Sequence, residues 1–147
     1  MSLITDKVFY NALRSNADLM ATVGGRIEST SIPVPDEQLD NEPVPYVIIT
    51  FDGLQNDGFT KDNDFEGDTD HVQVGIEVAA ATRDELGDIT QAIRETVIAY
   101  FEDEEGHAWD DYQYIPQHYT LTASPVGYES MKPCYFQTLT YNCDTNV

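Results

Sequence analysis

A switch of hydrophobic period between residues 71 and 101 is the strongest constraint that this sequence places on its fold. From His71 to Ala79, apolar residues alternate with polar or small ones, which predicts a strand with one core face. Thr82 and Glu85 then have capping-box spacing, so a helix is expected to begin between them. One apolar stripe follows at helical spacing: Leu86, Ile89, Ile93, Val97 and Tyr100 or Phe101.

Other segments add helices before this unit and strands on both sides of it. The predicted elements are a helix over 5–14, a short helical turn from Asn16 to Val23 ended by Gly24-Gly25, and strands over 46–51, 119–123 and 134–142. The first of these strands is apolar on both faces, and Asp52-Gly53 is expected to close it. Arg26-Ile27-Glu28 is expected to lead outward, residues 32–45 to form a proline-rich loop, and residues 54–69 a hairpin arm.

This order of elements predicts an α+β fold, with a mainly antiparallel sheet and helices packed on one face. The length of 147 residues fits one α+β domain over 1–147.

Charge is the most unusual property of the whole chain. It has 27 acidic and 7 basic residues, for a formal net charge of −20 and a pI near 4.1. Tight nucleic-acid binding is not expected, because binding phosphate depends on Lys and Arg. The acidity could serve solubility, reflect a salty host, or form a wall past which DNA moves without sticking.

No stretch reaches the ~20 apolar residues of a membrane span, and Met1 to Lys7 lacks the pattern of a signal peptide, so we expect no membrane partner. Cys134 and Cys143 lie at the two ends of one predicted strand segment, about 30 Å apart, so free thiols are expected. Neither has the spacing of a zinc site.

Catalytic signatures are missing from the sequence, which predicts no enzyme, no catalytic residue and no cofactor. His107 lies near Trp109, Asp110 and Asp111, which could suggest a metal site or an acid-base cluster, but we expect an acidic loop with one anchoring tryptophan. His71 and His118 stand at the beginnings of strand segments, where a place on the rim of a sheet is expected.

The acidic segment 62–70 partly copies a calcium loop. Carboxylates alternate along it and Gly67 takes the sixth position, but Gln73 replaces the bidentate glutamate of the twelfth and the flanks are not helical. The calcium candidates are Asp62, Asp64, Glu66, Asp68 and Asp70. The other interpretation is an interface arm or a lumen-facing arm, formed by Asp62, Asp64, Phe65, Glu66, Asp68 and Asp70.

Four segments together resemble a known family. Ala17 to Ile27 resembles the helix-to-"VGxRI" signature of phage and prophage tail-completion proteins, which are similar to the tail terminators of long-tailed phages. Pro45 to Ile48, Val72 to Val74 and the helix from Arg83 to Phe101 continue the resemblance, which covers about two-thirds of the chain. Glu28, the long acidic loop and the strands after residue 110 depart from the pattern.

The resemblance implies a structural tail protein without catalytic residues. Its copies would join into a ring, a hexamer by family resemblance, that caps the tail tube and meets the head connector. The protein would occupy the bacterial host cytoplasm during assembly and then the virion tail. The alternatives are another neck or connector component of the phage, or a small metal-binding module that uses residues 62–70.

Overall fold

The computed structural model describes residues 5–29, 44–56, 69–102, 108–109, 112–113, 118–131 and 133–146. The helices are α1 (Thr5–Arg14), α2 (Ala17–Thr22) and α4 (Arg83–Phe101). The strands are β1 (Ile27–Ser29), β2 (Tyr46–Asn56), β3 (Thr69–Ala80), β4 (Ala108–Trp109), β5 (Tyr112–Gln113), β6 (His118–Ala123), β7 (Gly127–Glu129) and β8 (Cys134–Asn146).

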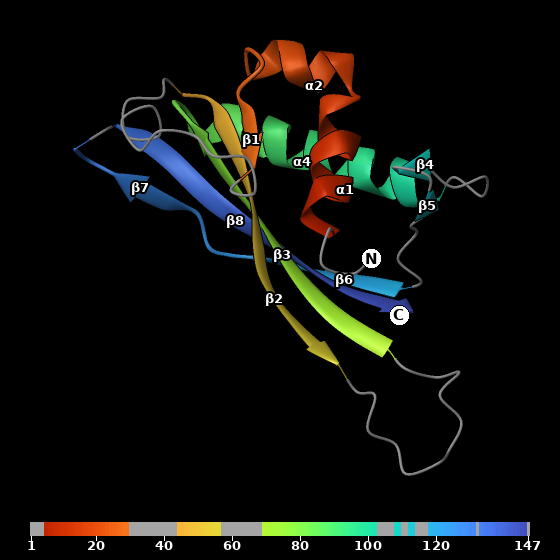
Figure 1. Cartoon of the computed structure of the whole chain (residues 1–147). Coiled ribbons are helices and arrows are strands. Elements are labelled where there is room, and N and C mark those ends of the chain that lie inside the picture. The colour runs from red at the N-terminus through yellow and green to blue at the C-terminus, as the bar shows by residue number, and fades with distance from the viewer. Residues whose placement is uncertain are drawn as a thin grey trace, which may run out of the picture.

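Within these residues, six strands form one sheet in the order β1-β2-β3-β8-β6, and β7 pairs with the beginning of β8. β1 runs parallel to β2, whereas every other pairing in the sheet is antiparallel. All three helices lie on the same side of the sheet (Figure 1). The α+β fold and the mainly antiparallel sheet that the sequence predicts are therefore confirmed.

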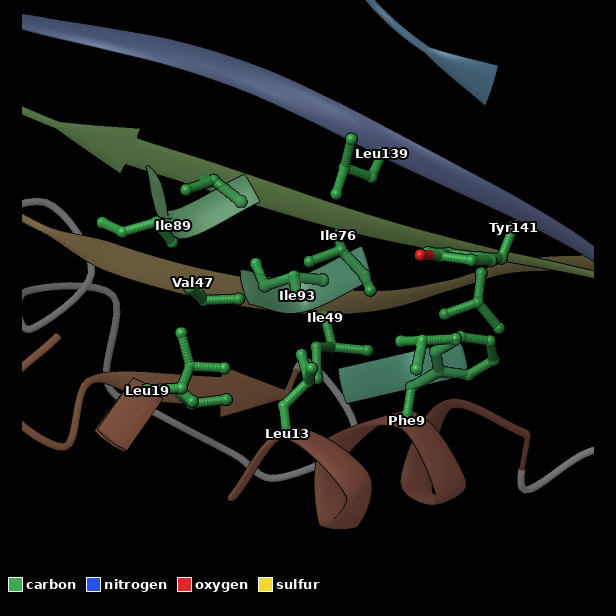
Figure 2. Close-up of a cluster of buried hydrophobic side chains, with 14 of the residues drawn as sticks. Phe9, Leu13, Leu19, Val47, Ile49, Ile76, Ile89, Ile93, Leu139 and Tyr141 are labelled. Atoms are coloured by element: carbon green, nitrogen blue, oxygen red, sulfur yellow. The ribbon is translucent and has the colours of Figure 1, made fainter. Parts of the chain in front are cut away.

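The core lies between that face of the sheet and the helices. The predicted apolar stripes of β3 and α4 are both buried, and α1 adds its own apolar face. Figure 2 shows Ile93 of α4 among the strand residues Ile49 and Ile76. Phe9 of α1 packs against Tyr141 of β8 with ring centroids 5.0 Å apart, so the first helix closes on the last strand.

Both helix signals read from the sequence are confirmed. Thr82 caps α4, because its hydroxyl oxygen accepts a hydrogen bond from the Glu85 amide at 3.1 Å. After α2, Gly24 and Gly25 take φ values of 61° and 76°, a left-handed conformation that glycine adopts without steric cost.

The expectation that Arg26-Ile27-Glu28 leads outward was wrong, because this segment contributes to β1. The Arg26 side chain donates through Nε to the Pro45 carbonyl oxygen at 2.8 Å, and the Val47 amide donates to the Arg26 carbonyl oxygen at 2.9 Å. These two bonds hold the chain beside β2, with Ile27 opposite Val47.

Two strand ends were also predicted too early. β2 continues through Asp52-Gly53 to Asn56, since Gly53 (φ 149°) absorbs a register shift against β3 instead of ending the strand. β8 continues past residue 142 to Asn146. The predicted arm over 54–69 begins inside β2 and ends at the first residue of β3. Residues 57–68, between the two strands, lie outside the described part of the chain.

Candidate interaction surfaces

A groove lies between α2 and α4. Its volume is about 580 Å³. Its apolar floor comes from Leu19, Ile89, Ala92, Ala99 and Tyr100. Leu19 and Ile89 also belong to the hydrophobic core, so the groove borders the core between the two helices.

Asn16 positions the two helices that form this α2–α4 groove. Its Oδ1 accepts hydrogen bonds from the amides of Asp18 (3.1 Å) and Leu19 (3.2 Å), which caps α2. Its Nδ2 donates to Thr96 Oγ1 of α4 at 2.8 Å. One side chain therefore both starts α2 and ties it to a helix 80 residues away.

The charge around the α2–α4 groove has one sign. Asp18, Asp88 and Glu95 are among its lining residues, and its lining includes no Lys or Arg within the described part of the chain. An apolar floor beside three carboxylates suits a partner segment that offers an apolar side chain flanked by basic ones.

The face of the sheet opposite the helices carries several hydroxyl groups. Its central row runs across four strands through Thr50, Gly75, Thr140 and Thr122. In the same face, Thr50 Oγ1 donates to Asp52 Oδ1 at 2.7 Å. The described strand residues on this face include no Lys or Arg, so the face has little to offer a phosphate backbone.

The structure places two of the three histidines, His71 and His118, opposite Asp144 of β8. His71 Nδ1 lies 2.6 Å from Asp144 Oδ1. In the sheet, Asp144 is also the residue of β8 that stands opposite His118 of β6. Residues His107, Asp110 and Asp111 lie outside the described residues, and of Trp109 only the backbone in β4 is described. The pairing across β8 brings His71 and His118 to one row of the sheet, a relation that spacing in the sequence could not give.

Most of the predicted arm site is also outside the described part of the chain. Asp62, Asp64, Phe65, Glu66 and Asp68 belong to it, so neither the calcium interpretation nor the interface interpretation is tested. Asp70 lies in β3, where its backbone pairs with Asn56 on one side and Thr145 on the other. Among the described side chains, no group of three or more His, Cys, Asp or Glu is arranged to hold a metal ion.

Neither Cys134 nor Cys143 forms a disulfide, as the sequence predicted, and both side chains are buried. Burial, with a smaller contribution from Asp144, raises the pKa of the Cys143 thiol to about 12. Burial also raises the pKa of Tyr141, which packs against Tyr119 with ring centroids 5.9 Å apart. A thiol with so high a pKa stays protonated at neutral pH and is a poor nucleophile. Cys143 is therefore a core residue.

None of the described helices combines the length and apolar character needed to span a membrane.

Comparison with known proteins gives one family and one fold. Residues 7–111 match the family described as "Tail completion protein gp17", and all four segments that resembled a tail-completion family lie inside this range. No curated protein sequence matches the chain. A chain in the solved structure "Virion of native gene transfer agent (GTA) particle" has a similar fold, with a TM-score of 0.60 and 14% sequence identity. The alignment covers 97% of this chain and 94% of that one.

Proposed function

This chain belongs to the tail completion protein gp17 family and is a structural protein of a phage tail, and we propose that it acts by assembling into a ring at the end of the tail tube. In this proposal the ring, a hexamer, contacts the last layer of tail-tube subunits on one side and the head connector on the other. Assembly takes place in the cytoplasm of the bacterial host, before the ring enters the virion.

The family match over residues 7–111 is the observation on which this proposal rests. The structure supports it with surfaces suited to proteins. The α2–α4 groove offers an apolar floor with acidic neighbours, and the sheet has one face without helices and a free edge. Different surfaces on one subunit are what a ring needs, because head-to-tail contacts join two unlike patches.

The net charge of −20 supports a place beside moving DNA. A ring at the junction of head and tail surrounds the path of the genome, and Lys or Arg side chains in its lumen would hold phosphates. The acidic segment 62–70 is our candidate for the lumen or for the contact with a neighbouring subunit. Alanine or lysine substitutions there should change head joining, tail length or DNA passage.

A gene deletion in the phage or phage-like element that encodes the chain tests the proposal. We expect the mutant to yield filled heads and separate tails, with tails of irregular length or without a terminal ring in electron micrographs. Purified protein added to the mutant extract should restore joined particles. Normal, infectious particles from the deletion mutant would contradict a role in tail completion.

A calcium titration separates the structural proposal from the metal-binding alternative. Calorimetry and thermal unfolding of the purified chain with and without calcium should show no site-specific heat and no increase in melting temperature. An Asp64→Asn, Asp68→Asn double variant is the control, since it removes two candidate ligands with little change in size. Saturable heat that this variant loses would favour the metal-binding module.

A further inference from the structure

The sheet has a free edge made of two strands placed end to end. β6 pairs with Leu139 to Asp144 of β8, and β7 pairs with Cys134 to Phe136 on the same side of that strand. Both lie along β8 in Figure 1, with β7 at the left and β6 at the right. We call residues 118–131 the free edge, because no described strand pairs with β6 or β7 on the outer side.

Hydrogen bonds to β8 hold the junction between the two strands in place. The Ser124 amide donates to the Thr138 carbonyl oxygen at 2.9 Å, and the Ser124 hydroxyl oxygen accepts from the Thr138 amide at 2.9 Å. Gln137 Nε2 donates to the Ser124 carbonyl oxygen at 2.8 Å. The free edge is therefore held against β8 at β6, at Ser124 and at β7.

The free edge lacks the charges that usually protect an exposed strand. Folded proteins block such edges with Lys and other charged side chains, because unpaired backbone groups recruit further strands. Residues 118–131 contain one charged side chain, Glu129, in a chain with 27 acidic residues among 147. Within β6, the threonines Thr120 and Thr122 are exposed, and threonine favours strand pairing.

Apolar side chains stand exposed at the β7 end of the same edge. Met131 is 94% exposed and Tyr128 is 57% exposed, even though Tyr128 already packs on Tyr135 with ring centroids 5.0 Å apart. Large apolar groups beside an unprotected strand mark a surface that is covered in the working state of a protein.

We propose that the free edge is where a second copy of this chain docks, through strand pairing with β6 and burial of Tyr128 and Met131. This inference rests on the proposed self-assembly and names its surface. The charge of this surface favours a second copy as the partner. Two copies that each carry a net charge of −20 repel each other least where they meet through residues 118–131, which contain one charged side chain among 14 residues. The α2–α4 groove, with three carboxylates in its lining, instead suits a basic partner.

Glutamate substitutions on β6 test the inference. Thr120→Glu with Thr122→Glu should weaken association by about tenfold or more, because two carboxylates would have to lose water at the interface. Molar mass would be measured by light scattering across a concentration series. Ala21→Glu with Ala81→Glu is the matched control, because it adds the same two charges at exposed positions outside the free edge and outside the lining of the α2–α4 groove, and it should associate like the wild type.

Three outcomes separate this inference from the proposed function. A wild-type protein that stays monomeric at all concentrations would contradict self-assembly itself. A wild-type ring that the β6 variant also forms, or an Ala21→Glu, Ala81→Glu control that loses association equally, would overturn only the docking edge. Hydrogen exchange of backbone amides provides an independent measurement. The amides of residues 118–123 should exchange more slowly as the wild-type concentration rises. Unchanged exchange in an assembled sample would also overturn the proposal that this edge is the docking site.

Discussion

Asn16 shows how much of this architecture can depend on one side chain. Its carbonyl oxygen caps α2, while its amide nitrogen joins α2 to Thr96 of α4. The side chain thus performs two separable tasks, since an aspartate at the same position would keep the capping oxygen and lose the donor.

Substitutions of Asn16 should separate the two tasks. Asn16→Ala should lower the free energy of unfolding by roughly 1–3 kcal/mol, because both the cap and the bond to Thr96 disappear. Asn16→Asp should lower it by about 0.5–1.5 kcal/mol, since only the donor is lost. Urea unfolding would measure both, with Gln91→Ala on the exposed side of α4 as control. Equal losses for both variants would show that the cap contributes nothing.

Cys143 should make the fold sensitive to alkali. Its pKa is about 12 in the folded protein, well above its ordinary value near 9, so between these values the unfolded chain releases a proton that the folded chain retains. Stability is therefore full below pH 9 and falls as pH rises toward 12, by up to about 1.4 kcal/mol per pH unit from this thiol.

Urea unfolding at intervals from pH 7 to pH 11 would measure this effect. Cys143→Ala lowers stability at every pH because it empties buried space, but it should give a shallower decline above pH 9. Tyr141, whose pKa is also raised, would continue the decline above its ordinary value of 10. A Cys143→Ala variant with the same slope as the wild type would show that other groups cause the alkaline loss.

At the scale of elements, the parallel pair of β1 and β2 explains why two motifs of the sequence occur together. Gly24-Gly25 turns the chain after α2, and the Arg26 side chain then reaches the Pro45 carbonyl oxygen at the entry to β2. The "VGxRI" and "PYV" segments are therefore two sides of one contact.

Loss of this contact should weaken the edge of the sheet. Arg26→Ala should cost about 1.5–3 kcal/mol of stability, because it removes a hydrogen bond from a charged donor. Arg26→Lys keeps the charge without the Nε geometry and should recover only part of the loss. Chemical denaturation would measure both. Full recovery by lysine would mean that charge alone, and not the bond to Pro45, matters.

Elements with a strong local pattern could be predicted from the sequence, and those fixed by distant partners could not. The helices over 5–14 and 83–101 and the strand around residues 71–79 follow from periodicity and capping. β1 escaped prediction because three residues show no period, and its pairing with β2 depends on Arg26. Asp52-Gly53 has the sequence of a turn, but pairing with β3 carries β2 through it.

The candidate surfaces divide in the same way. The low charge of residues 118–131 is visible in the sequence, but only the sheet order shows that they form an edge. The α2–α4 groove could not be foreseen, because Asn16 and Thr96 lie 80 positions apart and nothing in either segment marks the other.

At the scale of the whole molecule, the net charge of −20 should control assembly through salt. The electrostatic repulsion between copies extends over about 30 Å at 0.01 M salt and over about 8 Å at 0.15 M salt. Association should therefore strengthen as sodium chloride is added. Light scattering of the wild type across a salt series would measure this. Association that weakens with salt would indicate that opposite charges, and not uncharged surfaces, hold the copies together.

The position of β8 inside the sheet bears on how the protein is made. This late strand lies between β3 on one side and β6 and β7 on the other, and its Tyr141 meets Phe9 of the first helix. During synthesis, β3 must therefore wait with one row of backbone groups unpaired until residues 134–146 leave the ribosome. A nascent chain stopped after Pro133 would hold an open apolar layer, and we expect it to aggregate or to be degraded instead of folding in part.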